Sequence, residues 1–291
     1  MGAFDRFPRV VERLEQLEAP EQQALGAAAE QSAFDFIARF PPFDLSLSQY
    51  ARRRTRGKRP EPPLLAQIWA RQQNRLYVLR RTTEQLRVEP FVLEDILTFE
   101  LGEILLHDWI ELEIQAGTQT RSLHVDFNAV GLDWIQSLVN ELRVRVSDAA
   151  PNDSPQMEAQ IAQFPYKWQM LAHKHAHVYG ELARILVYEP SISPRWFGRS
   201  GREGKLGMFM PQHVVLVREP LESYPYGWIT KSCVRSKVQS ARVTTTEQTA
   251  ALELTLGAHD FKWQIEMTRA YADALQVMAN ELHTAGAFAV S

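Results

Sequence analysis

Residues 109–127 decide the fold, and they read Trp-Ile-Glu-Leu-Glu-Ile-Gln-Ala-Gly-Thr-Gln-Thr-Arg-Ser-Leu-His-Val-Asp-Phe. Apolar and polar side chains alternate through 109–114 and again through 123–127, with a turn at 116–118 between them. A period of two places the apolar side chains on one face of a strand. The stretch therefore predicts two antiparallel strands, each buried on one face.

Downstream of these strands the apolar period changes to that of a helix. One stripe contains Ile135, Leu138, Val139, Leu142 and Val146. A helix laid across the open end of a strongly bent sheet buries the apolar faces of both. We therefore predict a unit of antiparallel strands that is closed by one C-terminal amphipathic helix.

A second, similar pattern follows later in the chain. Residues 112–114 resemble 252–254 at an offset of 140, and residues 75–79 and 86–90 resemble 205–209 and 216–220 at an offset of 130. The change of offset implies ten extra residues around 222–228. A helical stripe with Tyr271, Leu275, Met278 and Leu282 ends the second pattern. The order of elements thus predicts an internal repeat.

These patterns predict an α+β protein of two units with additional helices. The expected segments are an N-terminal helical segment (1–42), a first unit (43–146), a linker with a helix (147–181), a second unit (182–284) and a tail (285–291). Residues 147–155 are rich in turn formers, which favours the linker. Within the least regular part, 43–50 is expected to be the first strand and 63–71 a short helix.

Strands followed by one capping helix resemble the pleckstrin-homology-like superfold, including its bacterial and GRAM-like members. The second half carries the closer likeness, through Phe164-Pro-Tyr-Lys-Trp168, Gly180-Glu181, residues 213–217 and residues 226–229. The resemblance implies two tandem pleckstrin-homology-like units, each a bent antiparallel sheet capped by its helix. Members of this superfold bind phosphoinositides, peptides or protein partners, or only hold an assembly together. A fold of this kind does not define a function.

Composition excludes several classes of protein. The 291 residues carry a formal net charge of -3, which argues against a polycation that binds nucleic acid. Only one cysteine is present, so an internal disulfide and a cysteine-built zinc site are excluded. No apolar run reaches the roughly 18 residues of a membrane helix, and the N-terminus lacks a signal-peptide pattern. We therefore expect a cytoplasmic protein without a transmembrane segment.

Two basic segments are candidates for an anion-binding site. Their residues are Arg52, Arg53, Arg54, Arg56, Lys58, Arg59, Arg195, Arg199, Arg202 and Lys205. Several cations and free backbone N–H groups in a loop suit a cluster of phosphates. A solvated surface loop is the alternative interpretation. Neither segment matches a P-loop, because no glycine precedes Lys-Ser or Lys-Thr.

Aromatic residues and histidines give two further candidates. Tyr224, Tyr226 and Trp228 could anchor a partner or a membrane interface, or could fold back onto their own sheet. His173 and His177 lie four apart, as in some zinc sites, but no third ligand or His-Glu-x-x-His motif accompanies them. An exposed polar helix face is the preferred interpretation, so no metal or cofactor is predicted.

No catalytic signature emerges, so we expect a non-enzymatic binding or scaffolding protein. The favoured mechanism is contact with a protein partner, or self-association, through sheet edges and the 224–228 hairpin. The first alternative is recognition of an anionic headgroup or another phosphate-containing ligand by the basic segments. An enzyme of unknown class is the lesser alternative.

Overall fold

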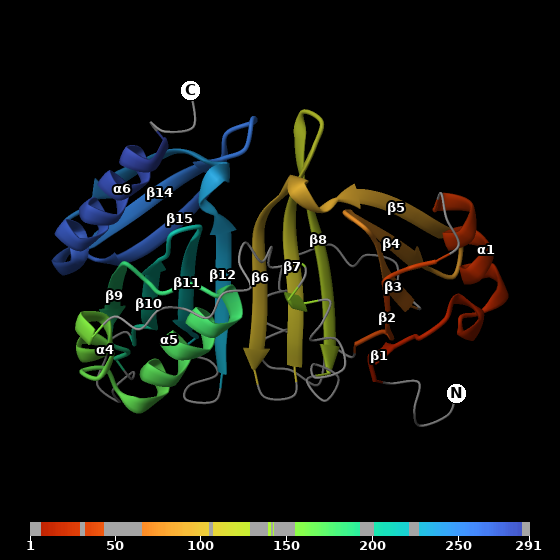
Figure 1. Ribbon diagram of the computed structural model, residues 1–291, viewed down its shortest axis with the longest axis horizontal. Coiled ribbons are helices and arrows are strands. Elements are labelled where there is room, and N and C mark those ends of the chain that lie inside the picture. The colour runs from red at the N-terminus through yellow and green to blue at the C-terminus, as the bar shows by residue number, and fades with distance from the viewer. Residues whose placement is uncertain are drawn as a thin grey trace.

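The computed structural model of the chain describes residues 7–29, 33–43, 66–104, 107–128, 139–140, 142, 155–192, 201–220 and 227–286 (Figure 1). Within these ranges fifteen strands form three antiparallel sheets, and four α-helices lie against them. A central sheet of seven strands separates the other two sheets, which lie toward the two ends of the molecule (Figure 1).

The central sheet combines strands from both halves of the chain. Its order is β8-β7-β6-β12-β11-β10-β9. The bounds are β6 (Ile96–Ile104), β7 (His107–Ala116), β8 (Gln119–Asn128), β9 (Ile185–Glu189), β10 (Gly204–Phe209), β11 (His213–Glu219) and β12 (Gly227–Val234). The two halves meet where β6 pairs with β12, from Ile104–Gly227 to Phe99–Ser232. We call this pairing the seam.

A five-stranded sheet covers β6–β8. It contains β1 (Arg9–Val10), β2 (Phe36–Phe40), β3 (Ala66–Gln72), β4 (Arg75–Arg81) and β5 (Leu86–Val92), in that order. Trp69 and Val78 pack with Leu101 and Ile110 of the central sheet in one apolar core. Helix α1 (Ala19–Ala28) covers the other face of this sheet, where Leu25 is buried.

Helices and the third sheet cover the remaining part of the central sheet. Helices α4 (Pro155–Ile161) and α5 (Tyr166–Tyr179) pack on the face that carries Val215 and Val217. Val217 pairs with Thr230, and Thr230 pairs with Leu101, so the five-stranded sheet and α5 share this face. The opposite face holds β13 (Val238–Thr245), β14 (Thr249–Leu256), β15 (Phe261–Thr268) and α6 (Ala272–Gly286).

The predicted fold class is wrong. Instead of an α+β chain of two separately capped units, the described residues form three antiparallel sheets in which strands outnumber helices by far, so the protein is mainly β. The order of four strands, a 3-10 turn and three strands does occur in both halves, with turns at Leu93–Asp95 and Arg235–Lys237. The seam nevertheless joins the halves into one sheet, because edge strands of two sheets complete each other's hydrogen bonds.

Two local expectations also fail. Residues 63–71 were expected to form a helix, but β3 begins at Ala66. The expected N-terminal helical segment contains α1 and then the strand β2. The expected first strand at 43–50 lies outside the described residues except for Phe43.

Candidate binding surface on helix α5

Most of the predicted site residues lie outside the described part of the chain. These are Arg52, Arg53, Arg54, Arg56, Lys58, Arg59, Arg195, Arg199, Tyr224 and Tyr226. Two predicted anion-binding residues are described, and both contact their own chain. The Arg202 guanidinium lies 3.4 Å from Glu189 Oε1, and Lys205 Nζ donates to the Glu266 carbonyl at 2.7 Å. Their role in binding an anion stays a prediction.

Trp228 lies in a row of side chains that crosses the seam. It pairs with Glu103 of β6, and Glu103 pairs with Asp108 of β7. On the other side, Glu219 ends β11 one residue beyond the pair Arg218–Ile229. We call Glu219, Trp228, Glu103 and Asp108 the seam row. The indole N–H of Trp228 donates to Glu103 Oε2 at 2.7 Å.

Helix α5 is fixed onto the seam row by its lysines. Lys167 Nζ donates to Glu219, and Lys174 Nζ donates to both carboxylate oxygens of Glu103 at 2.9 and 3.0 Å. Both ammonium groups also lie over the Trp228 ring, at 5.7 and 5.0 Å from its centroid. The two lysines are seven residues apart, so they project from one side of the helix. Helix α5 therefore bridges both halves of the chain.

The sequence explains why α5 forms and where it ends. Trp168, Leu171, Ala172, His175, Ala176 and Tyr179 are buried at helical spacing. The Tyr179 hydroxyl donates to Ser232 Oγ at 2.8 Å, and His175 Nε2 lies 3.2 Å from Thr230 Oγ1. Gly180 ends the helix at a positive φ of 67°, which a residue with a side chain adopts only at a cost.

Glycines allow close packing at two places, on β10 beneath α5 and on β6 at the seam. A Cβ at Gly204 would lie 2.7 Å from the Trp168 ring of α5, and a Cβ at Gly102 would lie 2.2 Å from the Trp109 ring. Both rings are buried. A side chain at either glycine would therefore collide with a buried indole ring.

Asp108 is the most perturbed acid of the seam row. Only 2% of the residue is exposed. Burial, and then the charge of Glu103, raise the pKa of Asp108 to about 8, against the smaller opposing effects of the Ile104 backbone and Lys174. A carboxyl with this pKa is largely protonated at pH 7.

The outer face of α5 carries an unusual exposed stripe. Tyr166 is 80% exposed and Met170 is 41% exposed, and His173 and His177 are exposed on the same side of the helix. These four residues, which we call the outer stripe, are spaced by three or four positions and so share one face. Helix α5 contains no acidic residue. The stripe therefore combines apolar and basic groups.

Sheet edges, by contrast, are occupied by side chains at several points. Gln67 Nε2 donates to the His124 carbonyl of β8 at 3.2 Å, and Gln160 Nε2 donates to the Leu186 carbonyl of β9 at 3.1 Å. On β15, Glu189 accepts the Thr268 N–H at 3.2 Å. These contacts use backbone groups that an added strand would need.

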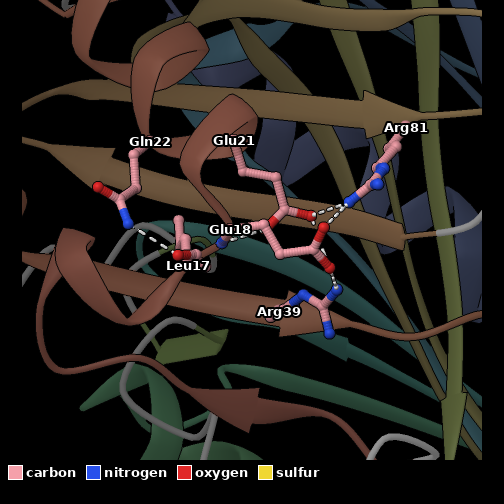
Figure 2. Close-up of polar contacts among 6 residues, drawn as sticks. All are labelled: Leu17, Glu18, Glu21, Gln22, Arg39 and Arg81. Carbon is pink, nitrogen blue, oxygen red and sulfur yellow. Dashed lines mark hydrogen bonds and ion pairs between the residues drawn. The ribbon is translucent and has the colours of Figure 1, made fainter. Parts of the chain in front are cut away.

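A second charged cluster lies at the far end of the molecule, where α1 meets the five-stranded sheet. Figure 2 shows Glu18 and Glu21 of the first turn of α1 facing Arg39 of β2 and Arg81 of β4. Arg39 Nη2 lies 3.2 Å from Glu18 and 3.6 Å from Glu21, and Arg81 Nη1 contacts Glu18 and lies 3.5 Å from Glu21. The hydrogen bond and charge of Glu18 raise the pKa of Arg81. We call these four residues the N-terminal cluster.

Histidines and carboxylates also meet on β7 and β8. Asp126 accepts from Nε2 of His107 and Nε2 of His124, both at 2.8 Å, and Nδ1 of His124 lies 3.2 Å from Glu111. Burial opposes ionisation of Asp126, but the two histidines lower its pKa overall. Across the residues that the structure describes, no group of three potential ligands could hold a metal ion. Burial raises the pKa of Cys233 to about 12, so its thiol stays protonated.

Comparison of the chain with protein-family models and with curated proteins finds no match. No helix within the described ranges is long and apolar enough to cross a membrane. The sequence pointed to Trp228 and to the exposed histidines. The structure places Trp228 at the seam, beside Lys167 and Lys174, and places His173 and His177 on the exposed side of α5. The sequence did not point to Tyr166, Met170 or the three carboxyl groups of the seam row, because the pairing of β6 with β12 has no local sequence signal.

Proposed function

We propose that this protein is a non-enzymatic binding or scaffolding protein, and that the outer stripe of α5 is its contact surface for a protein partner. The observation that carries the proposal is the exposure of Tyr166, beside Met170, on a helix whose opposite face is fully buried. Tyrosine supplies large contact area at a low entropic cost and is enriched at binding hot spots.

The fixation of α5 supports the same function. Lys167, Lys174 and Trp228 hold the helix on both halves of the central sheet, so the outer stripe is presented in one orientation. A preorganised surface loses less conformational entropy when it binds. The contacts at the edges of β8, β9 and β15 favour this surface over strand addition.

The chemistry of the stripe specifies its partner. Its N-terminal part carries Tyr166 and Met170, and its C-terminal part carries His173 and His177. Helix α5 has no acid of its own, and Glu158 of α4 lies 3.7 Å from His173 Nε2. The complementary surface is an apolar patch bordered by Asp or Glu on another protein. Such a contact weakens in high salt.

Position-specific cross-linking in cells tests this proposal. A photoreactive phenylalanine analogue at position 166 should capture a defined partner, and the same analogue at Val277 should not. Val277 is the matched control because it is 50% exposed on a different helix, α6. The captured protein is then purified and titrated against variants of the chain.

The titration decides the outcome. Tyr166→Ser with Met170→Ser should weaken binding of the purified partner at least about tenfold, since loss of hot-spot residues costs about 2 kcal/mol or more. Val277→Ser should leave binding unchanged. Equal affinity of both variants would contradict the proposal. Capture of a second copy of the chain would make the contact a self-association.

The predicted alternative has its own test. Vesicles with anionic lipids or inorganic polyphosphate should bind the chain and lose binding when Arg52, Arg53 and Arg54 become Ala. Salt between 50 and 300 mM should weaken this binding steeply. Anion binding without a partner at position 166 would favour the alternative.

A further inference from the structure

The seam row has three carboxyl groups, whereas α5 places two ammonium groups over it. Glu219 takes Lys167, and Glu103 takes Lys174 through both of its oxygens. Asp108 is the third carboxyl of the row and pairs directly with Glu103 across β6 and β7. Among the described residues, Lys174 is the cation that acts on both Glu103 and Asp108. One lysine therefore faces two carboxyl groups.

The surroundings of Asp108 make its protonation state decisive. On β6 it pairs with Glu103, whose carboxylate holds Lys174 of α5. A hydrogen bond from the Ile104 backbone and the charge of Lys174 both act to lower the pKa of Asp108. On β8 its partner is Phe127, which is apolar and buried. His107 and Asp126 bind each other on the two adjoining strands. An ionised Asp108 would thus be a buried carboxylate beside a second one, which is costly unless a cation moves to it.

We propose that Asp108 acts as a proton-dependent lock on α5. When Asp108 is protonated, Lys174 stays bound to Glu103 and the helix stays fixed across the seam. When Asp108 is ionised, it competes with Glu103 for Lys174 and the helix loosens. The proton passes to bulk water as the lock opens. The lock is a property of the chain alone. Its consequence, control of the outer stripe by pH, rests on the proposed function.

The sign of the effect follows from linkage. The pKa of Asp108 is about 8 in the folded state and 3.8 in its ordinary state. Its stabilising contribution is therefore complete below pH 4 and is lost as the pH rises to about 8. Half of the molecules are ionised near pH 8, so the lock is closed at neutral pH and open in alkaline solution.

Unfolding of the wild type and of Asp108→Asn, followed in denaturant from pH 5.5 to 9.5, tests the titration. Asparagine keeps the shape of the protonated acid and cannot ionise. The ratio of the folding equilibrium constants, wild type over variant, should fall about tenfold per pH unit and level off above about pH 8. A ratio that does not change with pH would overturn the proposal.

Deuterium pulse labelling tests the mechanical part. Exchange of the α5 amides should be the same in both proteins at pH 6.5, and at pH 9.5 it should be at least about fivefold faster in the wild type. Intrinsic exchange rates cancel, because the two proteins are compared at one pH. Helix α6 is the internal control, since it lies on the opposite face of the sheet. Equal α5 exchange at pH 9.5 would overturn the lock.

A second variant keeps the proposal testable if Asp108→Asn does not fold. Glu103→Gln removes the carboxylate that competes with ionised Asp108 for Lys174, so Lys174 can pair with Asp108 and α5 exchange should no longer rise at pH 9.5. Alkaline loosening of α5 as large as in the wild type would overturn the proposal. All these measurements use the isolated chain, so they can succeed or fail independently of any partner at Tyr166.

Discussion

The N-terminal cluster and the seam row are two charged networks that fix a helix to a sheet, and they differ in charge balance. In the N-terminal cluster, Glu18 and Glu21 face two arginines, and Glu21 is fully buried (Figure 2). In the seam row, three carboxyl groups face two lysines of α5. The first network is balanced and the second is not.

This difference shows two ways to attach a helix to a sheet, one through arginines and one through lysines. An arginine has several donors in a rigid plane and stays charged at any ordinary pH, so Arg39 and Arg81 can each bind two carboxylates together. A lysine is a compact charge that moves between acceptors on a flexible stem. The attachment of α1 therefore involves no competition for a shared lysine, whereas the attachment of α5 depends on the proton of Asp108.

The largest expected loss of stability follows from removing one carboxylate of the N-terminal cluster. Glu21→Ala leaves Arg39 and Arg81 with Glu18 alone and opens a polar cavity under α1. Breaking a buried ion pair by removing one partner costs about 4 kcal/mol of unfolding free energy. Denaturant unfolding at pH 7 measures it. Glu84→Ala, at an exposed position of the same half, is the control, and an equal effect of both changes would refute the structural role of Glu21.

The next effect concerns the packing at the seam rather than its charge. Gly102→Ala places a methyl group 2.2 Å from the buried Trp109 ring. Overpacking of this kind costs about 3 kcal/mol, because the ring and β6 must move. A thermal unfolding scan should show the loss, together with a changed near-ultraviolet dichroism of the indole. If the stability of the variant were unchanged, the packing at the seam would be loose, and it would not hold the side chains of the seam row in place.

Much of the first half could be predicted from sequence, and the failures have physical reasons. The alternation in 109–127 corresponds to β7 and β8 because each strand has one polar face. Residues 66–72 were missed because β3 lies between two apolar layers and is buried on both faces, which removes the period of two. A period of two also specifies faces and not neighbours, so nothing local indicates that β6 joins β12.

The predicted repeat illustrates the same limit. The offset of 130 compared β4 with β10, which occupy different places in the strand order. By order, β4 corresponds to β11, which begins at His213, and β6 corresponds to β13, which begins at Val238, so the offset stays near 140. Short apolar strand sequences resemble one another, so a match between two of them does not show that the strands occupy equivalent places. The exposed helix face with His173 and His177 was predicted, but Tyr166 and Met170 were not, because their exposure depends on which side of α5 packs.

The charge of the seam row can be altered without ionising Asp108. Lys167→Met leaves Glu219, which is buried, without its ammonium partner and should cost about 2 kcal/mol. Lys174→Met should cost less near pH 7, about 1 kcal/mol, because this lysine is one-third exposed. Lys262→Met, on an exposed position of β15, should stay within about 0.5 kcal/mol of the wild type. Unfolding in denaturant ranks the three, and a reversed order for Lys167 and Lys174 would mean that Glu103 and not Glu219 is the main anchor of α5.

The smallest expected change in stability tests whether apolar packing, in addition to the ion pairs, holds α1 on the sheet. Gly26 lies on the exposed side of α1, and a Cβ there would meet nothing within 4 Å, so Gly26→Ala should raise the free energy of unfolding by about 0.7 kcal/mol. Leu25 is fully buried against the sheet, so α1 should remain packed when Glu21 is replaced. The gain should therefore persist in the Glu21→Ala background to within about 0.4 kcal/mol. Disappearance of the gain there would mean that α1 detaches without its charged cluster, and that the two networks are both conditional.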